Sequence, residues 1–161
     1  MGIIRRMVTV RPAGADDGPT VARIYVDSWN EGFGELMPAA VLDGGRIARW
    51  SETLAGGNWW VAEVDGTVAG FVGIGASRDP IDPELGELDT IAVDSPYWRQ
   101  GVGTALMHEA LEHLAAQYDE AIVWTLANYP QGQKFYTKTG WTLSGSTRDD
   151  GRQVSYRRRF R

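Results

Sequence analysis

The chain has 161 residues, which suits one domain with a substantial core, so we expect a single domain over residues 1–161. It contains no cysteine, which excludes disulfides, thiolate metal sites and a cysteine nucleophile. No stretch has the length of a membrane span or a signal-peptide core, so we expect a cytoplasmic protein with no membrane partner. The net charge is −5, and −9 without the four arginines among the last five residues, which argues against a nucleic-acid partner.

The first half of the chain predicts strands and helices in the order β-α-α-β-β. Alternating apolar residues indicate the strands, and apolar residues at three-and-four spacing indicate the first helix. An Asp65-Gly66 dipeptide between two alternating runs is a strong hairpin signal. Glycines and a proline at 30–45 predict a loop that could include one short helix. The expected elements are strands at 7–12, 58–64 and 67–76 and helices at 16–29 and 46–54.

The second half predicts the order β-α-β-α-β-β after a polar, proline-containing loop. The expected elements are a loop at 77–86, strands at 87–93, 121–126, 141–147 and 154–160, and helices at 101–118 and 132–139. The complete order, β-α-α-β-β-β-α-β-α-β-β, contains too many consecutive hairpins for a doubly wound parallel sheet. We therefore expect an α/β (α+β) fold with a mixed, mostly antiparallel central sheet flanked by helices.

The stretch SPYWRQGVGTALM places Gly101 and Gly103 between a turn and a helix. A helix start presents unpaired main-chain N–H groups and partial positive charge, so it suits an anion such as a pyrophosphate. The alternative is that these glycines only allow a tight turn and close helix packing. Three polar side chains of the loop could contact phosphate oxygens: Arg99, Gln100 and Thr104.

Two common phosphate-binding patterns do not fit this loop. A nucleoside-triphosphate loop needs G-x-x-x-x-G-K-[ST], which the sequence lacks. A dinucleotide fingerprint needs a third glycine where Leu106 stands, and the acidic residue that would bind the ribose has no clear counterpart. ATP and NAD are therefore poor fits.

The segment ELDTIAVDSPYWRQGVGTAL, with KFYTKTGW downstream, resembles the GNAT superfamily of acyl-coenzyme A-dependent N-acyltransferases. The expected order of elements matches that family along almost the whole chain. The resemblance implies acetyl-coenzyme A as cosubstrate, with its pyrophosphate on residues 99–104 and its pantetheine arm paired with the strand backbone at 91–93. The implied cofactor-binding residues are Ile91, Ala92, Val93, Arg99, Gln100, Gly101, Val102, Gly103, Thr104 and Asn128.

One position of the family motif departs from the family pattern, and one of the implied residues has a structural alternative. Trp98 stands at the first position of the family motif [QR]-x-x-G-x-[GA], where the family has Gln or Arg. Because main-chain N–H groups supply most of the contacts to the pyrophosphate, we expect this departure to change local affinity or loop packing without abolishing binding. For Asn128, the alternative is a simple turn residue before Pro130.

Acyl transfer to an amine needs a base, because a lysine-like amine has a pKa near ~10.4 and is protonated at neutral pH. Glu87 and Asp89 are two apart on an expected strand, so they point to one side of the sheet, where apolar residues would be ordinary. The resemblance implies Glu87 as the general base, often acting through water, and Asp89 as a residue that binds or orients the acceptor. The alternative is that Glu87 is a solvent-exposed carboxylate at a strand end.

The resemblance also implies an oxyanion donor and an acid. The oxyanion donor would be the main-chain N–H of Val93. Tyr136 lies in FYTKTGW, which resembles the family segment F-Y-x-x-x-G-[FW], and it would protonate the departing thiolate as general acid. On helical spacing alone Tyr136 would be a core residue, and the hydroxyl of Tyr129 competes for the same role.

The acceptor is expected to enter at DSWNEGFGELMP, residues 27–38. Aromatic and acidic residues there could pack an apolar part or hold a cationic amine, and Glu31 is an alternative to Glu35; ordinary packing and capping are the competing explanation. The candidate acceptor-binding residues are Trp29, Phe33, Glu35 and Asp89. The acceptor class, a small-molecule or a protein amine, stays open, and a homodimer is an expectation of the family only.

The remaining motifs favour an enzyme without a metal. His108 and His113 are five apart on the long helix and face different sides, so we expect no metal site. No G-x-S-x-G occurs, which leaves a serine hydrolase unsupported. The alternative function is a non-catalytic acyl-coenzyme A-binding or regulatory module, and the presence of both Glu87 and Tyr136 favours the N-acetyltransferase.

Overall fold

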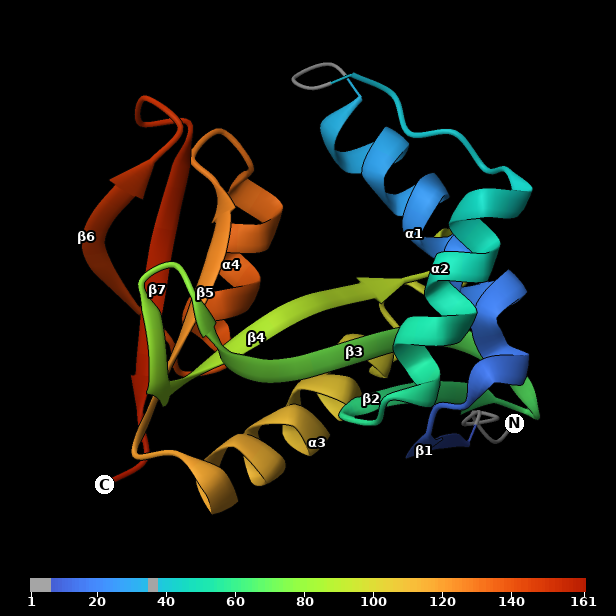
Figure 1. Ribbon diagram of the computed structural model, residues 1–161, viewed down its shortest axis with the longest axis horizontal. Coiled ribbons are helices and arrows are strands. Elements are labelled where there is room, and N and C mark those ends of the chain that lie inside the picture. Colours follow the sequence, from blue (N-terminus) through green and yellow to red (C-terminus); the bar gives the residue numbers. More distant parts are fainter. Residues whose placement is uncertain (1–6, 35–37) are drawn as a thin grey trace, which may run out of the picture. The chain divides into compact units, whose positions relative to one another are not determined.

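The structure is a computed structural model that describes residues 7–34 and 38–161 (Figure 1). It confirms the predicted order of strands and helices, with two short 3-10 helices, Ala15–Asp17 and Ser95–Tyr97, added. No helix in the described ranges is long and apolar enough to cross a membrane. The elements are β1 Val8–Pro12, α1 Gly18–Phe33, α2 Gly44–Ala55, β2 Trp59–Val64, β3 Thr67–Arg78, β4 Ile81–Val93, α3 Val102–Gln117, β5 Glu120–Leu126, α4 Pro130–Lys138, β6 Thr142–Arg148 and β7 Gln153–Arg159.

The seven strands form one sheet in the order β1-β2-β3-β4-β5-β7-β6. The pairs β1–β2, β2–β3, β5–β7 and β6–β7 are antiparallel, whereas β4 and β5 are parallel. This arrangement confirms the predicted mixed, mostly antiparallel sheet. Within the described residues the parallel ladder has two register pairs, Gly86↔Ala121 and Glu87↔Ile122, so it ends at the middle of β4.

The chain divides into two compact units, Met1–Gly73 with Thr90–Glu109 and Ile74–Asp89 with Ala110–Arg161. In the first unit, α1 packs beside α2 (Figure 1). Asp43 starts α2 by accepting the main-chain N–H of Arg46 at 2.8 Å, an N-cap contact. The core of this unit is the buried cluster Val21, Ile24, Leu54, Trp59, Val61 and Phe71.

In the second unit, β7 pairs with β5 along seven register positions, and α4 packs against β5 (Figure 1). After Glu120, the β5 residues Ala121, Ile122 and Val123 are apolar and buried, as expected for a strand covered on both faces. Gly86 of β4 lies where a Cβ would come within 2.8 Å of Leu114 Cδ2, so the second half of α3 rests closely on this strand.

The prediction of a loop at 77–86 is wrong. The strand β3 runs to Arg78 and β4 begins at Ile81, so Asp79 and Pro80 alone form the turn. The Ser77 hydroxyl donates to the Pro80 carbonyl at 2.6 Å across this turn. The polar and proline-rich composition of this stretch therefore belongs to the exposed tip of a long hairpin.

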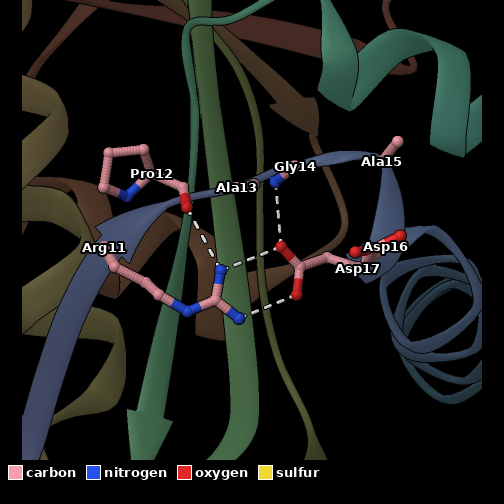
Figure 2. Close-up of a pocket in the computed structure, with 7 residues that line it drawn as sticks. All are labelled: Arg11, Pro12, Ala13, Gly14, Ala15, Asp16 and Asp17. Carbon is pink, nitrogen blue, oxygen red and sulfur yellow. Dashed lines mark hydrogen bonds and ion pairs between the residues drawn. The ribbon is translucent and has the colours of Figure 1, made fainter.

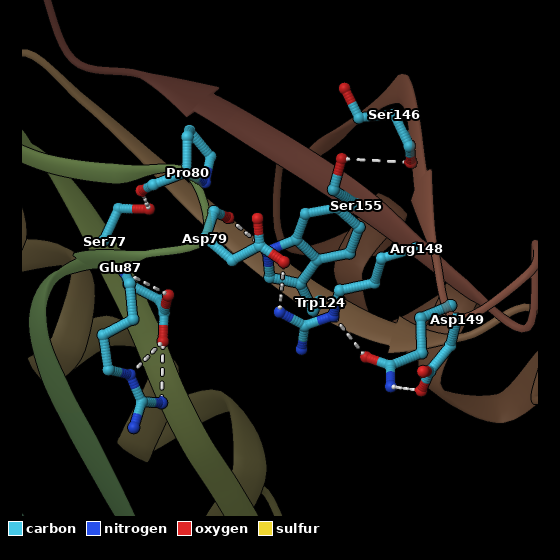
Figure 3. Close-up of polar contacts among 11 residues, drawn as sticks. Ser77, Asp79, Pro80, Glu87, Trp124, Ser146, Arg148, Asp149 and Ser155 are labelled. Atoms are coloured by element: carbon cyan, nitrogen blue, oxygen red, sulfur yellow. Dashed lines mark hydrogen bonds and ion pairs between the residues drawn. The ribbon is translucent and has the colours of Figure 1, made fainter.

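Side chains from other strands hold this hairpin tip (Figure 3). The Trp124 indole N–H of β5 donates to the Asp79 carbonyl at 2.8 Å, and the Arg148 guanidinium of β6 pairs with the Asp79 carboxylate at 3.1 Å. The same guanidinium lies over the Trp124 ring, 4.4 Å from its centroid. Such a cation–π contact adds to the ion pair, so the tip is fixed by partners distant in sequence.

Gly70 of β3 marks the close approach of α3 to the sheet in the first unit. A Cβ at this position would lie 2.7 Å from the Ala92 carbonyl oxygen of β4 and 3.0 Å from Leu106 Cδ1. Val102 Cγ1 would be 3.3 Å away. The first turns of α3 therefore occupy the space that a side chain would need, which brings the start of the helix to the end of β4.

Gly70→Ala is expected to lower the free energy of unfolding by ~1–3 kcal/mol, because a main-chain oxygen cannot yield to the new methyl without moving the strand. Urea unfolding measures this difference. Gly75→Ala is the matched control in the same strand, since a Cβ there meets no atom within 4 Å. Equal stability of the two variants would contradict close packing at Gly70.

Candidate active site

The predicted phosphate loop is a turn between β4 and α3. β4 ends at Val93, and after the 3-10 helix Ser95–Tyr97 the chain turns at 98–101. Arg99 and Gly101 both have positive φ, 62° and 82°. Left-handed residues in a turn direct main-chain N–H groups into a concave, anion-binding arrangement. The backbone conformation at 101 thus favours glycine.

The N-terminus of α3 is accessible from this turn. Its first helical hydrogen bond runs from the Ala105 N–H to the Gly101 carbonyl at 3.0 Å, so the preceding N–H groups have no partner within the helix. A Cβ at Gly101 would meet no heavy atom within 4 Å. Arg99 is exposed and makes no ion pair with any residue in 7–34 or 38–161. The turn thus combines main-chain donors with an uncommitted positive charge.

Two other side chains of the loop donate hydrogen bonds to nearby main-chain carbonyls. Gln100 donates its side-chain N–H to the Pro96 carbonyl at 3.1 Å. Trp98 is 41% exposed and donates its indole N–H to the Val93 carbonyl at 2.9 Å. Val102, Gly103 and Thr104 form the first turn of α3. The structure therefore gives Gln100 and Trp98 partners within the protein.

The residue that follows β4 is fastened to α1. The Asp94 carboxylate, only 8% exposed, accepts both terminal nitrogens of Arg23 at 2.9 and 3.3 Å. The hydrogen bond to Asp94 raises the pKa of Arg23, so its guanidinium stays charged at every accessible pH. Ser95 also donates to Glu31 of α1 at 3.3 Å. These contacts fix the path of the chain just after the half-buried residues Ile91, Ala92 and Val93.

Glu87 lies in the middle of β4 and is 6% exposed, so it is not a carboxylate at an exposed strand end. Both of its oxygens are hydrogen-bonded to Arg78 of β3 (Figure 3). Oε1 accepts the main-chain N–H at 3.1 Å, and Oε2 accepts Nη2 at 2.9 Å and Nε at 3.3 Å. The same Nη2 lies 3.1 Å from Asp89 Oδ2. Glu87 and Asp89 therefore face one side of β4 and share one guanidinium.

Sequence reasoning missed Arg78. It lies at the end of β3, inside the stretch that composition assigns to a loop, and its partners follow nine and eleven residues later. The hydrogen bond to Glu87 raises the pKa of Arg78, so the guanidinium stays charged. A prediction of a two-residue turn at Asp79-Pro80 would have placed Arg78 beside β4.

Tyr136 of α4 is 9% exposed, and its ring packs among aromatic neighbours. Trp141 meets it edge-on at 6.3 Å between centroids, and Tyr156 of β7 is tilted against it at 5.8 Å. Burial raises the pKa of the Tyr136 hydroxyl, and a charge on nearby Tyr129 would raise it further. The hydroxyl hydrogen-bonds to none of the described residues. It is therefore a protonated donor throughout the neutral range.

The end of β5 and the start of α4 carry the other two polar candidates. Asn128 is exposed and makes no hydrogen bond to the residues that the structure describes. The Tyr129 ring lies against Gly132, where a Cβ would be 2.7 Å from Tyr129 Cδ1. Both residues lie in the second unit, with Glu87 and Tyr136, whereas the phosphate loop belongs to the first.

The expected acceptor segment lies partly outside the described residues. α1 extends past the predicted helix end at 29 to Phe33, but the side chain of Phe33 and all of Glu35 lie outside the description. Trp29 donates its indole N–H to the Pro38 carbonyl at 2.9 Å. Asn30 exchanges two hydrogen bonds with Ala40, at 2.8 and 3.1 Å. These side chains tie residues 38–40 back to α1, which is the ordinary packing role weighed for Trp29.

A hollow of ≈ 420 Å³ is lined by residues 11–17 at the junction of β1 and α1 (Figure 2). Arg11 in its wall is already held by the Asp17 carboxylate at 2.8 and 2.9 Å and by Glu63 at 2.7 Å. The first of these hydrogen bonds raises the pKa of Arg11 most and lowers that of Asp17. Arg11 and Asp17 of this hollow are therefore paired with each other, and the described residues that line it include none of the predicted site residues.

Known N-acetyltransferases resemble this chain in sequence or in fold. The chain is 30% identical over 129 residues to the uncharacterized N-acetyltransferase YuaI of Bacillus subtilis, covering 77% of this chain and 75% of that protein. The PaiA N-acetyltransferase of Thermoplasma acidophilum in complex with coenzyme A has a TM-score of 0.73 at 18% identity, covering 95% of this chain and 99% of that one. YncA of Salmonella typhimurium with its cofactor acetyl-CoA has a TM-score of 0.75 at 17% identity, covering 96% and 94%.

The family assignment rests on the sequence match, because structural likeness at such low identity shows the fold alone. The family model described as the acetyltransferase (GNAT) family matches residues 19–141, most of the chain. The match includes β4, the turn at 98–101, α3 and α4. The chain therefore belongs to the GNAT acetyltransferase family, which confirms the expectation of an acyl-coenzyme A-dependent acetyltransferase.

Proposed function

We propose that the protein transfers an acetyl group from acetyl-coenzyme A to a primary amine of a small molecule or a protein. The observation that carries the proposal is the turn at 98–101, with Arg99 and Gly101 at positive φ and an open helix N-terminus behind it. Two structurally similar family proteins hold coenzyme A or acetyl-CoA. Acetyl-coenzyme A supplies the acetyl group as an activated thioester, and the protein provides binding groups, a base and an acid.

The proposed pyrophosphate site fits the residues present. Main-chain N–H groups at the start of α3 donate to phosphate oxygens, and the helix dipole adds partial positive charge. Arg99 supplies a full charge that no described carboxylate neutralises. Gly101 leaves open the space through which an anion reaches the backbone. The other residues proposed for this site are Gln100, Val102, Gly103 and Thr104.

The proposed site for the pantetheine arm is the end of β4. An extended ligand pairs with a strand through main-chain hydrogen bonds, and Ile91, Ala92 and Val93 offer such groups. The Val93 N–H is assigned to the thioester oxygen, where negative charge develops during attack, because preorganised donors there lower the barrier. Asn128 is assigned to the same arm through its side-chain amide.

Glu87 is the proposed base, and Asp89 is proposed to orient the acceptor. A protonated amine must lose a proton before it attacks, directly or through water. The Glu87 oxygens are held by Arg78, whose side chain is 71% exposed and is thus able to move into solvent. Such a movement frees Oε2 for the proton. Trp29, Phe33 and Glu35 stay proposed acceptor contacts on the α1 side.

Tyr136 is the proposed general acid. Its raised pKa keeps the proton on the hydroxyl until a strong acceptor forms beside it. As the C–S bond breaks, the Tyr136 hydroxyl would donate its proton to the leaving sulfur, which completes the transfer. The competing function, a binding module without turnover, is favoured by one observation, the engagement of both Glu87 oxygens by Arg78.

Calorimetric titration with acetyl-coenzyme A, with NADH and ATP as controls, tests the cosubstrate. We expect selective binding that Gly101→Asp weakens on the order of 100-fold, since a carboxylate then faces the phosphates, a loss of about 2.7 kcal/mol. Gly151→Asp is a matched control, because its φ of 81° equals that of Gly101 within a degree and its surroundings are equally open.

An amine screen by thiol release then separates the two functions. Turnover with an amine supports the acetyltransferase, whereas selective binding without turnover for any amine supports the binding module. Absence of acetyl-coenzyme A binding by a folded sample contradicts both. Equal affinities of Gly101→Asp and Gly151→Asp would remove the turn at 98–101 from the proposed site.

A further inference from the structure

The peptide that joins Val93 to Asp94 is held at both of its polar atoms. Its carbonyl, on Val93, accepts the Trp98 indole N–H at 2.9 Å. Its N–H, on Asp94, donates to the Ala69 carbonyl of β3 at 2.8 Å. The Asp94 side chain adds the paired contact with Arg23. The end of β4 is therefore anchored independently of any ligand.

Trp98 links this anchored strand end to the turn. Main-chain hydrogen bonds from Tyr97 to Asp94, at 2.8 Å, and from Trp98 to Ser95, at 3.2 Å, form the intervening 3-10 helix. The Trp98 side chain then reaches back over this helix to the last carbonyl of β4. The chain from Val93 to Trp98 thus forms a closed ring of hydrogen bonds, and the left-handed residues Arg99 and Gly101 follow directly.

We propose that Trp98 is a positioning residue that fixes the separation between the turn at 98–101 and the end of β4. This inference rests on the proposed function, in which the turn holds the pyrophosphate and the strand end holds the pantetheine arm. The indole N–H is directed to a protein carbonyl, so Trp98 acts through the backbone it fastens. This assigns a role to the residue that replaces Gln or Arg of the motif.

The affinity of a ligand that bridges two sites depends on how well their separation is fixed beforehand. A ligand that engages both sites gains from the preset distance, because less conformational freedom is lost on binding. A fragment that engages one site gains nothing from it. Trp98 therefore contributes to the affinity for the whole cosubstrate and not to the affinity for its halves.

The test compares Trp98→Phe with the wild-type protein by calorimetry, with acetyl-coenzyme A, ADP and pantetheine as probes. Phenylalanine keeps one aromatic ring and removes the N–H donor together with the rest of the indole. We expect acetyl-coenzyme A to bind about five- to tenfold more weakly, the effect of one neutral hydrogen bond, and each fragment to change by less than about twofold. Trp98→Leu, at a 41% exposed position, also removes the donor and gives the same comparison if the Phe variant fails to fold.

Trp124→Phe is the matched control. It also loses one indole N–H that donates to a main-chain carbonyl, that of Asp79, at 2.8 Å. We expect a similar loss of thermal stability in both variants, but weaker acetyl-coenzyme A binding only in Trp98→Phe. Unchanged acetyl-coenzyme A affinity, or an equal loss for the fragments, would overturn the role of Trp98 and leave the proposed function intact. No binding by the wild-type protein would overturn both.

Discussion

Tyr136→Phe is expected to lower kcat by at least about 100-fold and to leave the affinity for acetyl-coenzyme A within about twofold, as the loss of a general acid would. Phenylalanine preserves the ring contacts with Trp141 and Tyr156, so only the hydroxyl is removed. Thiol release under saturating acceptor measures kcat, and calorimetry measures the affinity. Because the Tyr136 pKa is raised, the wild-type kcat should show no decline from ionisation of this residue up to about pH 10.

Tyr129→Phe is the matched control for this prediction. It removes the competing hydroxyl one residue before α4 and should change kcat by less than about threefold if Tyr136 is the acid. A large loss in Tyr129→Phe with none in Tyr136→Phe would transfer the role to Tyr129. Unchanged kcat in both variants would leave Tyr136 as a member of the aromatic core.

Glu87→Gln is expected to lower kcat/KM by about 100-fold, because the amide keeps the size of the side chain and removes the proton acceptor. The pH dependence of kcat/KM should also differ between the two proteins, since the variant depends on acceptor amine that is already deprotonated in solution. The pH dependence of kcat/KM measured by thiol release distinguishes the two profiles.

Asp89→Asn is the control for the loss of charge beside Arg78. It keeps Glu87 and removes the other carboxylate, which lies 3.1 Å from the same Nη2. We expect its main effect on the KM of the acceptor, with kcat changed by less than about fivefold. A Glu87→Gln protein with a lower melting temperature and an unchanged pH profile would show that Glu87 serves only as the partner of Arg78.

Local patterns predicted the order of elements. The alternation in β1 and β2, the Asp65-Gly66 turn and the helical spacing in α3 depend on residues close in the sequence, and the structure confirms each of these elements. The pairing of Glu87 and Asp89 on one face also follows from the two-residue period of a strand. These features need no knowledge of the rest of the chain.

Contacts between distant residues escaped prediction. The β3–β4 hairpin extends to Asp79-Pro80 although its tip is polar, since Trp124 and Arg148 supply the hydrogen bond, ion pair and ring contact that hold it. Arg78 reaches Glu87 only because this hairpin is long. The hydrogen bond from the Trp98 indole to the Val93 carbonyl likewise depends on the geometry of a turn, which the amino-acid sequence alone does not reveal.

The left-handed turn at Arg99 and Gly101 has a consequence for how such a protein diverges in evolution. If the turn binds the pyrophosphate through main-chain N–H groups, as proposed, its backbone angles are constrained more strongly than the identity of its exposed side chains. The fold itself is shared with a protein that is only 17% identical. Substitutions that leave the loop able to fold should therefore follow the sign of φ at each position, whatever their separate effect on binding.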